Sequence, residues 1–365
     1  MRHAAFVAWF RRSEKVAASA GCTAAVAAAV GSPAWFAQSS TVGIGRARAM
    51  TLPTISRARD VLASIVASCP INQYGAAWNG EELEELPLPP EPWMLRPDPS
   101  TSRVHILGWT LDDLMFYGRA HWFVSQRYSN GLPAAFTWLP AEYVTVTASM
   151  MAGNAPVGTY TIQFQGTDVP LRDVVNFWSP LEPVLKVGVR TICTAERLEN
   201  AALRLATNPI GFGWLKVTGG EPLTPEELSE LGTGWVSART TLDGNAVGVL
   251  SQDVDYVESS MDPSRLQLVE ARAQSALDLA RIANVPPWIV GISIVGMTYS
   301  NVMEQNRQAL LYGALPFIEC INETLSSDQV TAPGRIIKLD TRLWLQETEQ
   351  PASRPAEPQQ TGVNQ

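Results

Sequence analysis

The sequence predicts an α+β fold, because stretches with helical periodicity flank a central stretch in which apolar residues alternate. Apolar residues recur every three to four positions near residue 55 and again after residue 190. Between residues 121 and 178 the spacing changes to two, as in antiparallel strands. Of the 365 residues 46% are hydrophobic and 17% charged, so the chain can bury a core of two or three domains.

The N-terminal part begins with residues 1–50, which are rich in alanine, glycine and serine and predict a flexible or partner-docked arm. A helix is expected next, with Pro53 near its start and an end before Pro70. Residues 79–100 contain four glutamates ahead of six prolines, which predicts an extended, solvated linker.

A second helix over residues 103–117 is expected to stop at Gly118 and to lead into an antiparallel meander. Asn130-Gly131 is a typical turn between two strands of a hairpin. Strands are expected at His121–Tyr128, Ala135–Leu139, Glu142–Ala148, Thr159–Phe164 and Val174–Trp178.

Two amphipathic helices are expected on either side of a mixed insert. The first covers Ile192–Leu205 and ends at Asn208-Pro209, and the second runs for about 21 residues over 262–283, or roughly 30 Å. Within the insert 209–260, Thr224 and Glu227 have the spacing of a capping box. Strands are expected in the insert at Val247–Leu250 and Val254–Val257.

A glycine-punctuated loop, Gly291 to Tyr299, precedes one more long helix, Asn301 to Leu325. Pro316 falls inside this helix and predicts a kink near Tyr312–Gly313. Residues 346–365 carry three prolines and are expected to be a disordered tail.

No reactive constellation is found, so we expect no catalytic residue, no metal and no cofactor. The sequence has no GxSxG elbow and no Walker A loop, and Gly211-Phe-Gly213 lacks the third glycine of a dinucleotide fingerprint. No two of the histidines, His3, His105 and His121, have metal-ligand spacing. The acidic pair Asp112-Asp113 lies in a predicted helix, and we expect a solvated face there.

The overall charge constrains the partners. The formal charge is −8, from 27 basic and 35 acidic residues, which disfavours a protein that grips nucleic acid through its phosphates. The charge is compatible with a surface that DNA passes without sticking. The low charged share and the twelve tryptophans indicate surface that partners cover. The four cysteines form no CxxC pair, so we expect free thiols in a reducing cytoplasm.

The N-terminus leaves two alternatives open. Four basic residues precede an alanine-rich run, residues 16–30, as in a secretory signal. One alternative is therefore a secreted or envelope-associated enzyme with an N-terminal signal. The other is a membrane-associated assembly protein that uses residues 1–36 as an interfacial helix.

An ordered set of motifs resembles the portal proteins of tailed bacteriophages. The set comprises IANVPPWIVG (282–291), TYSN (298–301) and LPFIE (315–319), preceded by SRARDVLASIVASCP (56–70), YGRAHWFV (117–124) and the WLP step (138–140). The resemblance covers about residues 52–345. The sequence departs from it at residues 176–178, where many members carry a histidine, and in the crown region, which is nearly absent.

The resemblance implies a portal-type fold with an α/β wing, a two-helix stem and a small mixed α/β clip. It further implies a long kinked helix next to a tunnel loop, and a minimal or absent crown. The implied parts are the wing (51–188), the stem helices (189–208 and 262–283), the clip (209–260), the tunnel loop (291–300), and the kinked wing helix with a closing strand (301–345).

The resemblance also implies a function. Portal proteins form a ring, usually of twelve copies, at one capsid vertex, through which double-stranded DNA is packaged and ejected without sequence specificity. The implied partners are the major capsid protein, the terminase large subunit, the head–tail connector or adaptor and, in some systems, a scaffold protein. The implied location is the capsid vertex of the virion, and the host cytoplasm during assembly.

Particular residues follow from this resemblance. The tunnel loop facing DNA would comprise Ile292, Ser293, Ile294, Val295, Gly296, Met297 and Thr298, with Gly291 and Gly296 as its hinges. The clip would contact terminase or the connector through Trp214, Lys216, Glu226, Glu227 and Trp235. Because phosphate is repelled by carboxylates, we expect aspartate and glutamate to dominate the channel wall and let the duplex slide.

Overall fold

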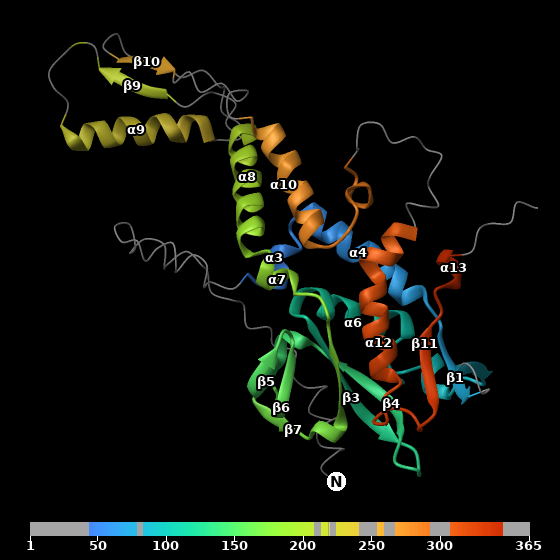
Figure 1. The fold of residues 1–365 in the computed structure, drawn as a ribbon. Coiled ribbons are helices and arrows are strands. Elements are labelled where there is room, and N and C mark those ends of the chain that lie inside the picture. Colours follow the sequence, from blue (N-terminus) through green and yellow to red (C-terminus); the bar gives the residue numbers. More distant parts are fainter. Residues whose placement is uncertain are drawn as a thin grey trace, which may run out of the picture. The chain divides into compact units, whose positions relative to one another are not determined.

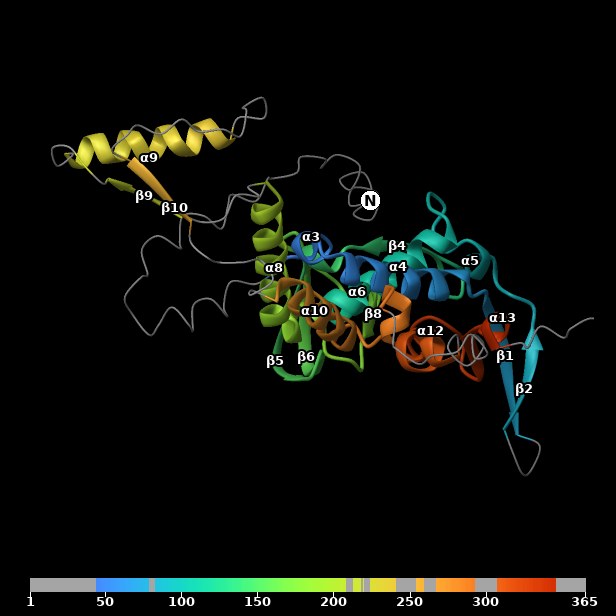
Figure 2. The same ribbon diagram turned by 90° about the horizontal axis from the view of Figure 1, so that it is seen from above.

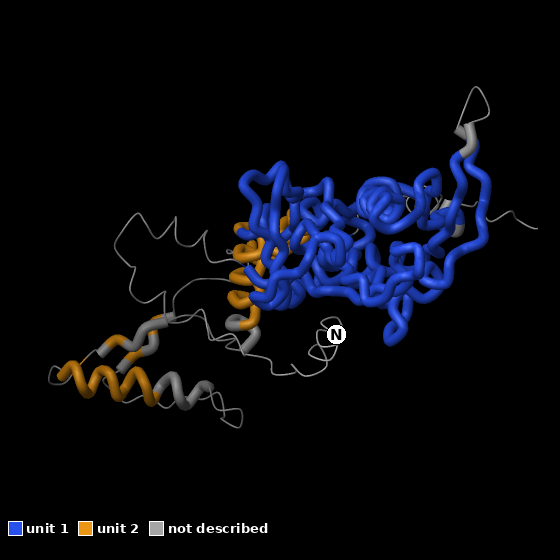
Figure 3. Tube along the Cα trace, turned by 90° about the horizontal axis from the view of Figure 1, so that it is seen from below, with its two compact units in different colours: residues 1–189, 280–365 blue, residues 190–279 orange. Residues whose placement is uncertain are grey.

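The computed structural model describes residues 44–78, 83–207, 213–217, 219, 224–240, 254–258, 267–292 and 307–345. The chain divides into two compact units, which Figure 3 shows in two colours. The first unit combines residues 1–189 with 280–365, and the second comprises Arg190–Leu279. Helices and antiparallel strands occur in both units, which confirms the predicted α+β class.

Two packed helices of the first unit have the predicted bounds. Helix α4 (Pro53–Ser68) has its proline in the first turn and ends ahead of Pro70. Helix α6 (Arg103–Tyr117) packs against α4 and ends at Gly118, whose φ of 71° lies in the left-handed region (Figure 1). The short helices α3 (Arg46–Ala49) and α7 (Val184–Val187) belong to the same unit.

The predicted meander forms two three-stranded antiparallel sheets. The first has the order β4-β3-β8 and the second β5-β6-β7, with 3-10 turns η1 and η2 before β5 and β8. The bounds are β3 (Arg119–Arg127), β4 (Pro133–Leu139), η1 (Ala141–Tyr143), β5 (Val144–Ala152), β6 (Ala155–Phe164), β7 (Thr167–Val169), η2 (Leu171–Asp173) and β8 (Val174–Trp178).

The alternation along β3 places its side chains in two separate cores. Trp122 is fully buried on one face, where its Nε1 donates to Oγ1 of Thr110 in α6 over 2.7 Å. Phe123, on the opposite face, belongs to an apolar cluster with Val144 and Phe164 of the second sheet. Residues 120–124 are consecutively buried, so this part of the sheet is covered on both faces and has a continuous buried run in place of a strict alternation of buried and exposed residues.

The linker predicted over residues 79–100 is wrong in part: residues 84–90 are exposed, but the segment contains a paired strand and a short, partly buried helix. Strand β2 (Leu83–Leu88) pairs with β1 (Ile71–Trp78), which also pairs with β11 (Arg335–Leu339), as Figure 2 shows for β1 and β2. Helix α5 (Pro92–Leu95) follows, and its Trp93 and Met94 are 1% and 0% exposed. Burial of these large apolar side chains outweighs the preference of the proline run for solvated backbone.

The C-terminal part of the first unit contains an irregular helix. A π-helical segment, η6 (Ala309–Ala314), precedes α12 (Leu315–Leu325), so the irregularity predicted near Tyr312–Gly313 takes the form of a wide turn. The 3-10 turn η4 (Pro287–Val290) and helix α13 (Arg342–Leu345) complete this part.

The second unit holds helix α8 (Val189–Thr207) from Arg190 onward and helix α10 (Leu268–Ile282) as far as Leu279. An ion pair of 2.9 Å between Glu199 and Arg272 joins the two helices. The other elements of this unit are β9 (Gly213–Val217) and β10 (Val254–Glu258), which pair, and helix α9 (Pro225–Thr240).

The second long helix is described from Leu268 onward, and its predicted start at Asp262 lies outside the described residues. The described helix has 15 residues and follows Gln267, whose φ of 46° no right-handed helix accommodates. The strand predicted at Val247–Leu250 lies outside the described residues, as do the arm before Ile44 and the tail after Leu345.

Candidate functional site

The described start of the predicted tunnel loop is fixed by a turn. Gly291 has a φ of 82°, and its N–H donates to the carbonyl of Trp288 over 3.1 Å. The N–H of Ile292 donates to the carbonyl of Pro287 over the same distance. This left-handed end of η4 requires the freedom of glycine, so the chain leaves the turn at a defined place.

Helix α4 contacts the same turn. Nε of Arg57 donates to the carbonyl of Ile289 over 3.4 Å, and the Ile289 side chain is 5% exposed. The turn before Gly291 is thus attached to the first long helix by one hydrogen bond and one buried side chain.

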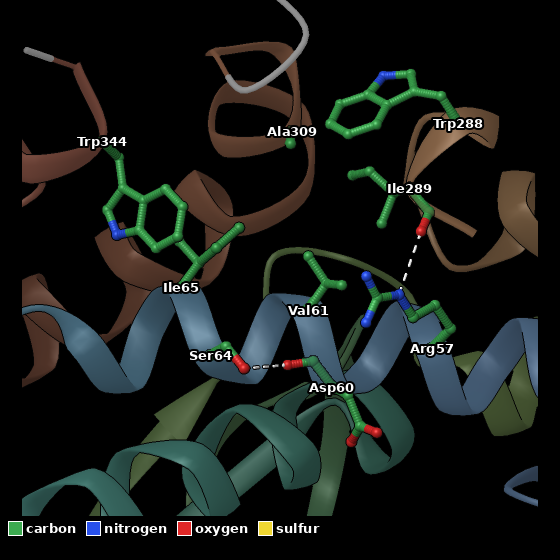
Figure 4. A pocket seen from close by; sticks show the side chains of 9 residues that line it. All are labelled: Arg57, Asp60, Val61, Ser64, Ile65, Trp288, Ile289, Ala309 and Trp344. Carbon is green, nitrogen blue, oxygen red and sulfur yellow. Dashed lines mark hydrogen bonds between the residues drawn. The ribbon is translucent and has the colours of Figure 1, made fainter. Parts of the chain in front are cut away.

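A groove of about 380 Å³ lies over α4 beside this turn. Trp288 and Trp344 stand on opposite sides of it, with Val61 and Ile65 of α4 between them, as Figure 4 shows. Arg57 is among its few charged lining residues. An apolar side chain fits such a lining. The hydroxyl of Ser64, which also lines the groove, donates to the backbone carbonyl of Asp60 over 2.7 Å.

The other predicted loop residues, Ser293, Ile294, Val295, Gly296, Met297 and Thr298, lie outside the described residues. The second hinge, Gly296, is among them.

The predicted clip residues belong to the second unit. Trp214 and Lys216 lie in β9, where Lys216 is exposed and stands opposite Asp255 of β10. Trp235 lies in α9. The structure thus distributes these residues over one strand and one helix of the same unit.

The predicted capping box at the start of α9 is confirmed. The N–H of Glu227 donates to Oγ1 of Thr224 over 3.4 Å, and the N–H of Thr224 donates to Oε2 of Glu227 over 2.9 Å. The hydroxyl of Thr224 also donates to Oε2 of Glu227 over 2.9 Å, and these two hydrogen bonds from Thr224 to Oε2 lower the pKa of this carboxyl. Glu226 and Glu227 are exposed in the first turn, where carboxylates complement the helix dipole.

The solvated face predicted for Asp112-Asp113 is wrong, since these side chains are 0% and 3% exposed. Asp112 accepts Nε of Arg46 at 2.5 Å and Nε of Arg59 at 2.6 Å. Both guanidinium groups lie over the ring of Trp109, with Cζ 4.8 and 5.2 Å from its centroid. One carboxylate therefore ties α3, α4 and α6 together.

Asp113 has a different environment. Its Oδ2 accepts Nε1 of Trp138 at 2.7 Å and the N–H of Ala141 at 3.2 Å. Burial raises the pKa of this carboxyl to about 8, against the lowering effect of both hydrogen bonds. The helical spacing of the two aspartates gave no hint of their burial. The signals in the sequence for the burial of Asp112 were Trp109, three residues before it, and the arginines of helices α3 and α4.

His121 is a fully buried residue of β3. Its Nδ1 and Oδ1 of Asn176 are 2.8 Å apart, and burial lowers its pKa to about 4. The histidine is therefore neutral at neutral pH and poorly suited to proton transfer. Asn176 lies in the stretch 176–178, where the sequence departs from the family resemblance.

The cysteines of the described chain are free thiols, which agrees with the prediction. Burial raises the pKa of Cys69 and of Cys320 to about 11, so neither is a reactive thiolate. Within the described ranges no three histidine, cysteine or acidic side chains are grouped as metal ligands. The described helices include none with the length and apolar character that spanning a membrane requires.

Comparison with known sequences identifies one family. The profile described as "Phage portal protein" matches residues 53–352. A protein described as "Probable portal protein" from Streptomyces phage phiC31 is 24% identical over 281 residues, which are 72% of this chain. The chain spans 60% of the length of that relative.

Solved structures give the same fold. The HK97 family phage portal protein from Corynebacterium diphtheriae has a TM-score of 0.64 and 26% identity, over 82% of this chain and 96% of that chain. A chain in the neck of an empty gene transfer agent (GTA) particle, computed with C6 symmetry, has a TM-score of 0.54 and 17% identity over 88% and 89% of the two chains. A chain in the neck of a native GTA particle, computed with C12 symmetry, has a TM-score of 0.53 and 16% identity over 84% and 88%.

The predicted resemblance is thus confirmed by the profile, which matches residues 53–352, and by the Corynebacterium diphtheriae structure, of which the match covers 96%. The chain belongs to the phage portal protein family.

Proposed function

We propose that this chain is the subunit of a portal ring that forms the channel for packaging and ejecting double-stranded DNA. The observation that carries the proposal is the match of the portal profile to residues 53–352. The coverage of 96% of the Corynebacterium diphtheriae portal chain supports it. The GTA necks, computed with C6 and C12 symmetry, support a ring of twelve copies.

Each part of the chain has a proposed role in this ring. Residues 51–188 form the wing, and the helices within 189–208 and 262–283 form the stem. The clip, 209–260, presents Trp214, Lys216, Glu226, Glu227 and Trp235 to terminase or to the head–tail adaptor.

The loop that starts at Gly291 faces the DNA. Gly291 and Gly296 act as its hinges, and the positive φ of Gly291 supports a fixed exit from the turn. Residues 301–345 support the loop with the irregular helix and the closing strand.

The net negative charge of the chain is suited to a channel through which DNA moves. Each subunit contributes a formal charge of −8. A wall in which carboxylates predominate repels phosphate and offers no deep minima in which the duplex would be held. DNA is therefore a passing partner without sequence specificity.

The remaining partners follow from the position at a capsid vertex of the virion. The ring contacts the major capsid protein, docks the terminase large subunit during packaging and the adaptor afterwards, and receives a scaffold protein where assembly uses one. Assembly takes place in the host cytoplasm. No catalytic role, metal or cofactor is part of this proposal.

Electron microscopy and native mass measurement of the purified full chain test it. We expect a ring with a central hole that admits a double helix, and a mass that is a multiple of 39.7 kDa. A stable monomer that hydrolyses a substrate would instead support the secreted-enzyme alternative and end the portal proposal.

A further inference from the structure

The carbonyl oxygen of Tyr312 accepts a hydrogen bond from a side chain outside its own helix. Nδ2 of Asn284 donates to it over 2.6 Å. In an unbroken α-helix this carbonyl would accept the backbone N–H four residues later. That residue is Pro316, which has no N–H. Asn284 therefore supplies the donor that Pro316 lacks.

Pro316 also accounts for the π-helical segment that precedes α12. In an α-helix the pyrrolidine ring collides with the carbonyl four residues earlier. A wider turn separates the two groups, and the N–H of Leu315 accordingly donates to the carbonyl of Leu310, five residues earlier. Such segments are rare and frequently lie at functional positions.

The backbone of Asn284 aims its amide group. Asn284 has a φ of 54°, which asparagine tolerates better than most residues. Its N–H donates to the carbonyl of Arg281 over 3.1 Å, and the N–H of Val285 donates to that of Ala280 over 3.0 Å. These hydrogen bonds end helix α10 at a fixed place, so the direction of the Asn284 side chain is set.

Gly313 brings the segment close to its neighbours. A Cβ atom at this position would lie 2.9 Å from Cδ2 of Leu62 and 3.6 Å from the carbonyl oxygen of Asn284. Leu62 is fully buried in α4. The wide turn is thus held between α4 on one side and Asn284 on the other.

We propose that Asn284 is a positioning residue which, together with Pro316, holds Ala309–Ala314 in the π-helical register. The register determines which side chains ahead of α12 are buried: Leu310 is 1% exposed and Tyr312 is 63% exposed. Converting the segment to α-helix would remove one residue from the turn and rotate the preceding residues by about 100° relative to α12. The inference rests on contacts within the first unit and does not depend on the proposed function.

Hydrogen exchange of the full-length protein, followed in a peptide that covers residues 307–315, tests the proposal. Asn284→Gly keeps the left-handed backbone and removes the donor. We expect exchange to accelerate about fivefold, since one hydrogen bond contributes roughly 1 kcal/mol. In a Pro316→Ala background the same substitution should change exchange less than twofold, because residue 316 then provides its own N–H to Tyr312.

Two further variants keep the result interpretable. Gln165→Gly replaces another residue with positive φ, whose side chain makes no hydrogen bond within the described part of the chain, and should leave the peptide unchanged. Asn284→Asp replaces the amide with an acceptor-only group of the same size and stands in if Asn284→Gly fails to fold. Equal acceleration with and without Pro316→Ala, or none at all, would overturn the proposal. Ring formation, recorded on the same samples, reports on the proposed function separately.

Discussion

Gly118 ends helix α6 at a point where no side chain fits. Its φ is 71°, and a Cβ atom would lie 2.8 Å from Cγ of Asn154. The Asn154 amide donates to the carbonyls of Ser179 and Leu181 over 3.0 and 2.7 Å. The absence of a side chain at Gly118 thus allows the end of α6 to contact the turn between β5 and β6 and the segment that follows β8.

Gly118→Ala should therefore destabilise the protein by roughly 2–4 kcal/mol, the sum of left-handed strain and lost hydrogen bonds of Asn154. Gly131→Ala is the matched control, because Gly131 has a φ of 86° and nothing within 4 Å of the added Cβ. It should cost only about 1 kcal/mol. Chemical unfolding of both variants measures the difference, and equal losses would contradict the role given to Asn154.

Asp113 predicts a pH dependence. Its folded pKa of about 8 lies above the ordinary value of 3.8, so the folded state binds this proton more tightly than the unfolded state. The contribution of Asp113 to stability is therefore most favourable below about pH 4 and declines as the pH rises to about 8. Asp113→Asn keeps an acceptor for Trp138 and abolishes the titration.

Between pH 5 and pH 8 the free energy of unfolding of the wild type should fall by on the order of 3 kcal/mol relative to Asp113→Asn. His121 acts in the opposite sense, because its lowered pKa removes stability as the pH falls below 6.5. Its effect is common to both proteins and cancels in the comparison. Parallel pH profiles would show that Asp113 is ionised in the folded protein.

At the scale of elements, a single buried carboxylate joins three helices. Asp112→Ala would leave the guanidinium groups of Arg46 and Arg59 without their shared partner and should cost about 3–5 kcal/mol. Asp60→Ala is the control, since Asp60 pairs with Arg59 at 3.0 Å but is 55% exposed, and should change stability by about 0–1 kcal/mol. Similar effects of the two substitutions in denaturant titrations would argue against the tie between α3, α4 and α6.

The sequence predicted those elements whose local signals agree with their packing. Helices α4 and α6 have apolar stripes with a proline at the start of one and a glycine at the end of the other, and the Asn130-Gly131 turn lies between β3 and β4. The linker over 79–100 was wrong in part because β2 pairs with the preceding strand β1, although its glutamates and Pro87 hide the alternating apolar pattern of a strand.

The candidate site was predictable only in part. The turn at Gly291 followed from its glycine, and the capping box followed from the spacing of Thr224 and Glu227. The burial of Asp112, by contrast, depends on arginines 53 and 66 residues away in the chain. The contact of Asn284 with Tyr312 spans 28 residues, and no local periodicity encodes it.

For the whole molecule, the charge of the ring predicts weak and non-specific contact with DNA. The assembled ring should bind a short duplex more weakly than about 10⁻⁴ M at physiological salt, because a net anionic wall releases few counterions. Fluorescence anisotropy across a range of salt concentrations measures this affinity. Tight binding with a steep salt slope would mean that lysine and arginine cluster along the bore.

Strand β2 is an edge strand of the sheet β11-β1-β2, and its Leu86 and Leu88 side chains are 48% and 37% exposed. The unpaired backbone groups of an edge strand can pair with a strand of another copy of the chain, and exposed leucines favour such aggregation. Pro87 interrupts the row of amide donors there, and the exposed carboxylate of Glu84 adds like-charge repulsion between copies. In the proposed ring, which gathers many copies of this subunit, we expect these two features to oppose fibre formation.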